Sequence, residues 1–168
     1  VSGFAIGAQT LVGQALGKGD ETAARDALKK TLVLGLGFVF VVCISAVLLH
    51  KPILSLFVPN ADISVQNEFY STGFILFICL CGWMLFDAAD IIVSGALKGA
   101  GDTRFVMMWM FVSSFLIWLP IVFLVAAVHN TITALWATQV LYVVVISTGT
   151  ILRWRGEKWK NIRLSEKL

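Results

Sequence analysis

The chain has 168 residues, of which 58% are hydrophobic and only 14% are charged, and its net charge is +3. An ordinary soluble domain is about 45–50% apolar and about 25% charged, so both values exclude a typical soluble domain and indicate a membrane protein. The basic residues are separated by apolar runs, which argues against a nucleic-acid-binding surface.

The hydrophobic residues form five runs, each of which we expect to be a membrane-spanning helix, because about 20 mostly apolar residues cross the hydrocarbon core. The first run, VSGFAIGAQTLVGQALG, ends at a Gly-Lys-Gly-Asp turn. It is interpreted as the last part of a span that begins upstream in a longer protein. The expected spans are about 1–17 (partial), 31–50, 68–97, 104–128 and 131–153, followed by a basic tail over 154–168. The sequence therefore predicts an all-α, polytopic membrane helix bundle.

The basic residues are distributed unevenly among the connections. All but one of the 13 Lys and Arg residues lie in the segments 18–30 and 98–104 or follow from Arg153 onward. The exception is Lys51, and the connection at 129–130 contains no basic residue. Cytoplasmic loops are rich in Lys and Arg, so we predict that these segments and the C-terminus are cytoplasmic, in a bacterial inner membrane.

Two connections on the basic side resemble each other, QALGKGDET (14–22) and GALKGAGDT (95–103). Glycine permits the turn conformations, and Asp20 and Asp102 are expected to cap the following helices by accepting hydrogen bonds from free backbone N–H groups. An internal duplication and the common requirements of a tight helix hairpin explain this likeness equally well. Glycines at helical spacing also predict close packing between helices, at the pairs Gly3/Gly7, Gly13/Gly17 and Gly95/Gly99.

The tail alternates basic residues with tryptophans in RWRGEKWKNIR (153–163). Tryptophan prefers the headgroup layer of a bilayer, and Lys and Arg favour its anionic inner leaflet. Trp154 and Trp159 are therefore predicted to anchor the tail to the membrane surface.

The sequence contains no arrangement of reactive side chains that is typical of an enzyme. His50 and His129 are expected at the outer ends of spans, and Cys43, Cys79 and Cys81 fall inside spans without the neighbours that complete a metal site. We therefore predict a protein without catalytic activity, without a cofactor or a dedicated metal centre, in which the cysteines serve packing.

Two aspartates, Asp87 and Asp90, interrupt the third span, which is otherwise free of charge from Phe69 to Leu97. An advance of about 100° per residue places both on one stripe of the helix, with apolar residues opposite. The stripe consists of Thr72, Leu76, Cys79, Trp83, Asp87, Asp90 and Ser94. Both carboxylates are therefore expected to face other helices or water rather than lipid.

An ionisable residue inside a membrane is a functional-site hypothesis, because one charged carboxylate near the bilayer centre costs roughly 3 kcal/mol. Asp87 and Asp90 are neighbours on the helix surface, so ionising both adds repulsion. The pair is expected to hold a proton or bind a cation, as a cation-coupled antiporter requires. The alternative, given more weight for Asp90 than for Asp87, is a protonated carboxyl hydrogen-bonded to a Ser or Thr of a neighbouring helix.

Other polar residues of the spans could face the same cavity, although packing explains each of them at least as well. These possible cavity-lining residues are Trp83, Ser94, Ser114, Thr138, Gln139 and Tyr142. Pro120 is expected to kink the fourth span and to free a carbonyl group there.

The segment FDAADIIVSGALKGAGDTR (86–104), followed by Pro120 in FLIWLP, resembles the second half of the multidrug and toxic compound extrusion (MATE) family of transporters. The segments AQTLVGQALGKGDETAAR (8–25), ALW (134–136) and GEKWK (156–160) resemble other parts of that half in the same order. The resemblance implies a twelve-helix exporter of two six-helix lobes, driven by entry of Na⁺ or H⁺ and acting on small organic, cationic substrates. This chain would supply part of the eighth helix and the ninth to twelfth helices, and the N-terminal lobe of the same protein would lie outside it.

The resemblance also implies roles for individual residues. An acidic residue at the position of Asp87 takes part in cation binding in the family, so a Na⁺ ion or a proton is expected there. The position of Asp90 is often Gln in relatives and that of Ser114 is often Tyr, so both residues depart from the family pattern.

Two alternatives remain open from the sequence. A flippase-like exporter of lipid-linked saccharides from the same superfamily would more often line its cavity with basic residues, and no span here has one in its interior. A non-transporting membrane scaffold that assembles through its glycine faces gives no reason for Asp87 and Asp90. Export of organic cations is therefore the favoured function.

Overall fold

The computed structural model describes residues 1–56, 63–128 and 131–164, and every regular element within these ranges is a helix. Four stretches are long and apolar enough to cross a membrane: Glu21–Leu48, Phe69–Gly99, Thr103–Val128 and Ala134–Arg155. The prediction of an all-α membrane helix bundle is confirmed. The helices are α1 (Ser2–Gly17), α2 (Glu21–Leu48), α3 (His50–Ser55), α4 (Ile63–Gly99), α5 (Thr103–Phe111), η1 (Val112–Trp118), α6 (Leu119–Val128), α7 (Ile132–Arg155) and η2 (Lys158–Leu164).

Some helix ends differ from those expected from hydrophobicity alone. α2 begins ten residues before the apolar run at 31–50, because the polar segment from Glu21 onward is itself amphipathic. Its Ala24 and Leu28 are buried, and charged residues occupy the exposed positions around them. The connection at 129–130, with His129, lies outside the described residues.

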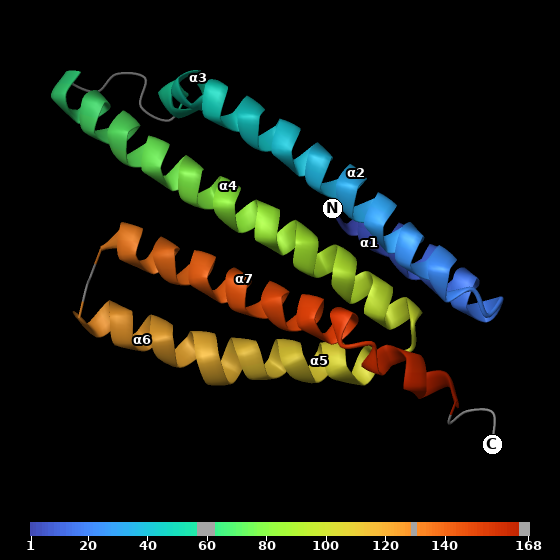
Figure 1. The fold of residues 1–168 in the computed structure, drawn as a ribbon. Helices are drawn as coiled ribbons and strands as arrows, with labels where there is room; N and C mark the ends of the chain where they lie inside the picture. Colours follow the sequence, from blue (N-terminus) through green and yellow to red (C-terminus); the bar gives the residue numbers. More distant parts are fainter. Residues whose placement is uncertain (57–62, 129–130, 165–168) are drawn as a thin grey trace.

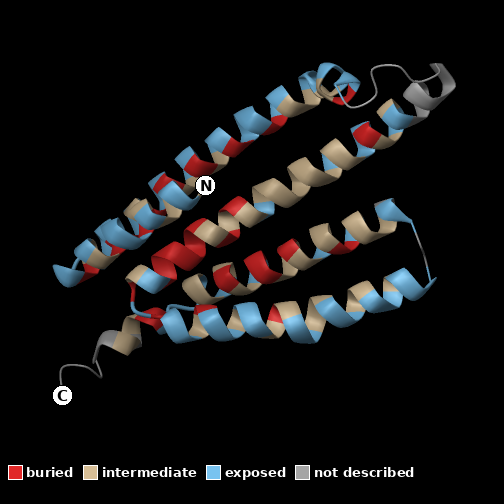
Figure 2. Ribbon diagram, turned by 180° about the vertical axis from the view of Figure 1, so that it is seen from behind, coloured by how far each residue is buried: buried red, intermediate tan, exposed pale blue. Residues whose placement is uncertain are grey.

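α4 is the central helix of the bundle (Figure 1). It packs against α1 and α2 on one side and against α7 on the other, and α7 also packs against η1 and α6. The turns α1–α2 and α4–α5 lie at the same end of the bundle as η2, and the sequence assigns most Lys and Arg residues to this end. Figure 2 shows that the buried residues gather along α4 toward this end, whereas α5 and α6 are mostly exposed.

The two glycine-rich turns share their backbone geometry as well as their sequence. Gly19 and Gly101 both have positive φ angles, 77° and 91°, which favour glycine. The N–H of the following aspartate donates to the carbonyl five residues earlier in each turn, at 3.0 Å for Asp20 and 2.9 Å for Asp102. The predicted cap is confirmed at Asp20, whose carboxylate accepts a hydrogen bond from the N–H of Ala23 at 2.9 Å. It is wrong at Asp102, whose side chain makes no cap hydrogen bond and binds elsewhere.

The helix pair α1–α4 approaches closely through glycine, as the sequence predicts for Gly95/Gly99. A Cβ atom on Gly95 would lie 2.4 Å from the carbonyl oxygen of Ala5, and one on Gly99 would lie 2.3 Å from that of Gln9. Gly13 lies on the other side of this contact, where a Cβ would meet the carbonyl oxygen of Gly99 at 3.3 Å. A Cβ atom on Gly3 or Gly7 would meet no atom within 4 Å among the described helices, so close packing at this pair stays a prediction.

Replacing Gly99 with Ala is expected to lower the free energy of unfolding by about 1–3 kcal/mol, because the new methyl group forces two backbones apart. The matched control is Gly82→Ala on the same helix, where a Cβ meets nothing within 4 Å. Thermal unfolding of the detergent-purified full-length protein measures both changes. Equal melting temperatures for the two variants would contradict the close contact between α1 and α4.

The fourth span is divided by a π-helical segment, η1, between α5 and α6. Pro120 follows this segment by two residues. Proline has no N–H to donate, and its ring crowds the carbonyl four residues earlier, so the turns before it deviate from regular α-helix. The hydroxyl of Ser113, inside η1, donates to the carbonyl of Trp109. The irregularity expected from Pro120 thus takes the form of a widened helix in this structure.

The described part of the tail folds back onto the bundle, and the prediction that its tryptophans lie at the membrane surface is wrong for Trp159. Trp159 is only 1% exposed and belongs to the same buried cluster as Ala24 and Leu28. Its indole N–H donates to the carbonyl of Trp154 at 2.9 Å, and the two rings stack at 4.6 Å. A tryptophan can be buried fully once its N–H has a partner, and this contact removes it from the headgroup layer.

Ion pairs hold the tail against α2. Arg25 pairs with Glu157, and Lys160 pairs with Glu21 at 2.7 Å and with Glu157 at 3.0 Å. Hydrogen bonds from Arg25 and then from Lys160 lower the pKa of Glu157, because both stabilise its carboxylate. These pairs link the tail to α2, and Trp159 of η2 is buried in the cluster that contains Ala24 and Leu28.

Candidate functional site

The two aspartates of α4 lie on the side of the helix that faces the bundle, but their surroundings differ. Asp90 is 6% exposed and therefore buried, and Asp87 is half-buried. Ser94, one turn beyond Asp90, is also buried. On the opposite side of α4, the fully buried Ile92 lies so close to α2 that a Cβ on Gly35 would clash with it.

Asp90 is tied to α7 by a hydrogen bond. The hydroxyl of Thr150 donates to the Asp90 carboxylate at 2.8 Å, and Thr150 itself is only 1% exposed. The alternative to cation binding was a carboxyl group hydrogen-bonded to a Ser or Thr of a neighbouring helix. Asp90 makes a hydrogen bond of this kind to Thr150. This hydrogen bond joins α4 to α7, and the expected part of Asp90 in cation coupling stays a prediction.

Asp87 makes no hydrogen bond or ion pair with any residue in the described ranges. It lies one turn from Asp90, toward the end of the bundle that is remote from the basic residues. A carboxylate without a partner inside a membrane span favours protonation or the binding of a cation, since either one removes the uncompensated charge. Of the two acids, Asp87 is thus the one without a hydrogen-bond partner in the described ranges.

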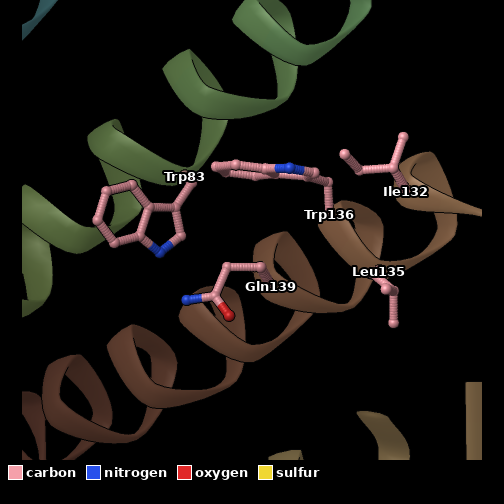
Figure 3. Close-up of a pocket in the computed structure, with 5 residues that line it drawn as sticks. All are labelled: Trp83, Ile132, Leu135, Trp136 and Gln139. Atoms are coloured by element: carbon pink, nitrogen blue, oxygen red, sulfur yellow. The ribbon is translucent and has the colours of Figure 1, made fainter. Parts of the chain in front are cut away.

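A pocket of about 450 Å³ lies between α4 and α7 (Figure 3). It is lined by Trp83, Ile132, Leu135, Trp136 and Gln139. Trp83 reaches into the pocket from α4, and Trp136 and Gln139 reach toward it from α7. Trp83 and Gln139 are two of the residues singled out in the sequence, and Trp83 stands four residues before Asp87 on the same stripe.

The sequence interpretation missed Trp136, Leu135 and Ile132. A signal for Trp136 exists, because it precedes Gln139 by three residues and so lies on the same face of α7. Spacing alone does not reveal which of the polar residues of α7 points toward α4. Thr138, for example, was predicted to line the cavity but does not line this pocket.

Four of the predicted cavity-lining residues do not line the pocket. Ser94 and Thr138 are buried, and the Thr138 hydroxyl donates to the carbonyl of Leu135 on its own helix at 2.7 Å. Ser114 and Tyr142 bond to each other, with 2.8 Å between their hydroxyl oxygens. This contact joins η1 to α7, so Ser114 and Tyr142 act as a polar bridge between helices.

A largely buried ion pair between Arg153 and Asp102 lies at the end of the bundle that carries the basic residues. The spacing of these residues along the chain does not predict it. Arg153 binds Asp102 through two nitrogens, Nε to Oδ2 at 2.7 Å and Nη2 to Oδ1 at 3.3 Å. The guanidinium also lies over the ring of Phe105, 4.7 Å from its centre. This bidentate, charge-assisted pair directs the Asp102 carboxylate toward Arg153, and its side chain makes no cap hydrogen bond to α5.

The cysteines Cys43 and Cys81 face each other between α2 and α4, and each thiol lies within 4 Å of the other residue's carbonyl oxygen.

Within the ranges that the structure describes, no three His, Cys, Asp or Glu side chains lie close enough together to hold a metal ion. The expected Na⁺ or H⁺ at Asp87 stays a prediction.

Comparison with known proteins gives two kinds of match. A family model described as MatE matches residues 1–124. The chain is 28% identical over 120 residues to the probable multidrug resistance protein NorM of Rhodopseudomonas palustris, covering 70% of this chain and 24% of that protein. It is also 28% identical over 130 residues to the multidrug resistance protein MdtK of Edwardsiella ictaluri, covering 77% of this chain and 27% of that protein. The chain thus spans about a quarter of the length of these relatives, and no solved structure matches it.

Proposed function

The chain belongs to the MatE family, and on that premise we propose that it forms part of an antiporter that exports drugs or other organic cations in exchange for Na⁺ or H⁺. Two relatives are named as multidrug resistance proteins, which supports export as the activity. The proposal includes a whole protein of two lobes, in which this chain is the C-terminal part and the remaining helices complete the cavity.

The observation that carries the proposal is the carboxylate of Asp87. It is half-buried in a membrane span, it has no partner in the described ranges, and Trp83, one turn before it on α4, lines a pocket with aromatic walls. Holding an ionised carboxylate at such a depth costs roughly 3 kcal/mol unless a proton or a cation neutralises it. An exchanger needs a carboxylate that a proton or a cation can neutralise in turn, and Asp87 would serve this purpose.

In the proposed cycle, Asp87 binds an organic cation from the cytoplasm while its site faces inward. After the lobes reorient by alternating access, an incoming Na⁺ ion or proton occupies the carboxylate and displaces the cation outward. The hydrogen bond from Thr150 keeps Asp90 in place during this exchange, so Asp90 positions α4 against α7. The cycle moves substrates without changing them chemically.

Reconstitution of the full-length protein in vesicles tests this function. We expect an imposed gradient of Na⁺ or of protons to drive ethidium across the membrane against its own concentration gradient. Movement of ethidium that is independent of both gradients would overturn the coupling, and absence of any movement in folded protein would favour the scaffold alternative.

A further inference from the structure

Two of the three cysteines come together from different helices, although their spacing in the sequence does not indicate it. Cys43 of α2 and Cys81 of α4 are 38 residues apart in the chain. Each thiol donates toward the carbonyl oxygen of the other residue, at 3.9 Å from Cys43 and 3.8 Å from Cys81. Because these contacts are reciprocal, the two backbones lie about one cysteine side chain apart at this point. Both thiols are free, and neither is part of a disulfide.

The two thiols lie in an apolar part of the bundle that can still be reached from outside. Cys43 is 6% exposed and forms a buried cluster with Val39 and Ala88. Cys81 packs against this cluster and is only partly buried, so a small ion has access to its sulfur. Both residues belong to stretches that are long and apolar enough to cross a membrane. An isolated thiolate would be an uncompensated charge there, which membrane spans disfavour.

We propose that Cys43 and Cys81 together bind one soft divalent cation of the mercuric type, Hg²⁺. Each S–H bond is replaced by an S–Hg bond, and two protons pass to the solvent without any change of oxidation state. The product combines two thiolates with one divalent ion and is electrically neutral, as apolar surroundings require. The bound ion would join α2 to α4. The proposed transport cycle does not use these residues, so this inference is independent of it.

The number and the type of the ligands select this class of ion. Thiolates favour soft metals over ions such as Mg²⁺ and Ca²⁺, which prefer oxygen ligands. Zn²⁺ also binds thiolates, but its structural sites have four ligands. Among the residues that the structure describes, no group of three His, Cys, Asp or Glu side chains could begin such a set. A monovalent soft ion such as Cu⁺ would leave one negative charge on the complex inside the span. A soft divalent ion that accepts two ligands satisfies both conditions.

Equilibrium dialysis of the reduced, detergent-purified full-length protein tests this site. The dialysis buffer contains HgCl₂ and an excess of 2-mercaptoethanol, a monothiol that removes Hg²⁺ from single cysteines, and elemental analysis counts the mercury bound per protein. Removing one of two linked ligands should weaken binding about a hundredfold or more, because the second thiol then no longer binds intramolecularly. We therefore expect Cys43→Ala and Cys81→Ala each to retain one mercury ion fewer than the unmodified protein. The matched control is Cys79→Ala, two residues from Cys81 on the same helix, which should lose none.

Thermal unfolding provides a second measurement of the same site. One equivalent of Hg²⁺ should raise the melting temperature of the unmodified protein and of Cys79→Ala, because an ion that binds only the folded state stabilises it. The melting temperatures of Cys43→Ala and Cys81→Ala should not rise. Cys43→Ser and Cys81→Ser, which nearly keep the size of the side chain, replace the alanine variants if those do not fold.

Three results would overturn the site. The first is equal retention of mercury by the unmodified protein and by the Cys43 and Cys81 variants. The second is a loss in Cys79→Ala as large as theirs, since mercury would then bind the cysteines singly. The third is retention of Zn²⁺ as strong as that of Hg²⁺ at the same two residues, which would contradict a site with two ligands.

Discussion

Replacing Asp87 with Asn is expected to reduce the ion-driven export of ethidium by the full-length protein about tenfold or more. Asn keeps the size of the side chain but cannot carry the charge that a proton or Na⁺ neutralises. The attraction between unit charges about 4 Å apart is roughly 1–4 kcal/mol at the dielectric constants of water and of a protein surface, which corresponds to such a change in affinity. Initial rates in vesicles with an imposed ion gradient measure the effect.

Asp90→Asn is the matched control for this prediction, one turn away on the same helix. Its side-chain carbonyl can still accept the hydrogen bond from Thr150, so the contact between α4 and α7 persists. We expect export to fall less than in Asp87→Asn. Ion-dependent export that survives in Asp87→Asn but fails in Asp90→Asn would reverse the roles assigned to the two acids.

Replacing Arg153 with Leu is expected to destabilise the full-length protein by about 3–5 kcal/mol, because it leaves the buried carboxylate of Asp102 without its counter-charge. Asp102 is 4% exposed, and Arg153 is 23% exposed. Removing both charges in the double variant Asp102→Leu, Arg153→Leu should recover much of the loss, since no unpaired charge then remains. Thermal unfolding in detergent, followed by helical circular dichroism, measures the three variants.

The control for the ion pair is Glu21→Gln, which removes the partner of Lys160 at the same end of the bundle. Glu21 is 50% exposed, so solvent already screens this pair, and the expected change is less than about 1 kcal/mol. Similar losses in Arg153→Leu and Glu21→Gln would show that burial of Asp102 does not determine the strength of its contact.

The periodicity of the third span was sufficient to predict that the side of α4 with the aspartates faces another helix. Asp90 and Ser94 are buried on that side, and Trp83 lines a pocket there. The periodicity did not predict that the opposite side, with Ile92, is buried as well. The close contact at Gly95 and Gly99 was predictable for a similar reason, since small residues four apart leave one side of a helix flat. Both features depend on the spacing of residues within one helix, and that spacing can be seen directly in the sequence.

Features that join distant segments could not be predicted in this way. Asp102 occupies a position typical of a helix cap, and only the fold brings it to Arg153, 51 residues later. Trp159 has the neighbours of a residue at the membrane surface, but it belongs to a buried cluster to which α1, α2, α4 and α5 all contribute. In both cases the neighbouring sequence favours one environment for the residue, and a contact with a distant part of the chain places it in another.

The burial of Trp159 also restricts the order in which the protein can assemble during synthesis. The cluster that contains Ala24 and Leu28 lacks one of its largest side chains until η2 emerges, after α4, α5, α6 and α7 have been translated. The cluster, to which α1, α2, α4 and α5 contribute, is therefore completed only after the last spanning helix has been translated.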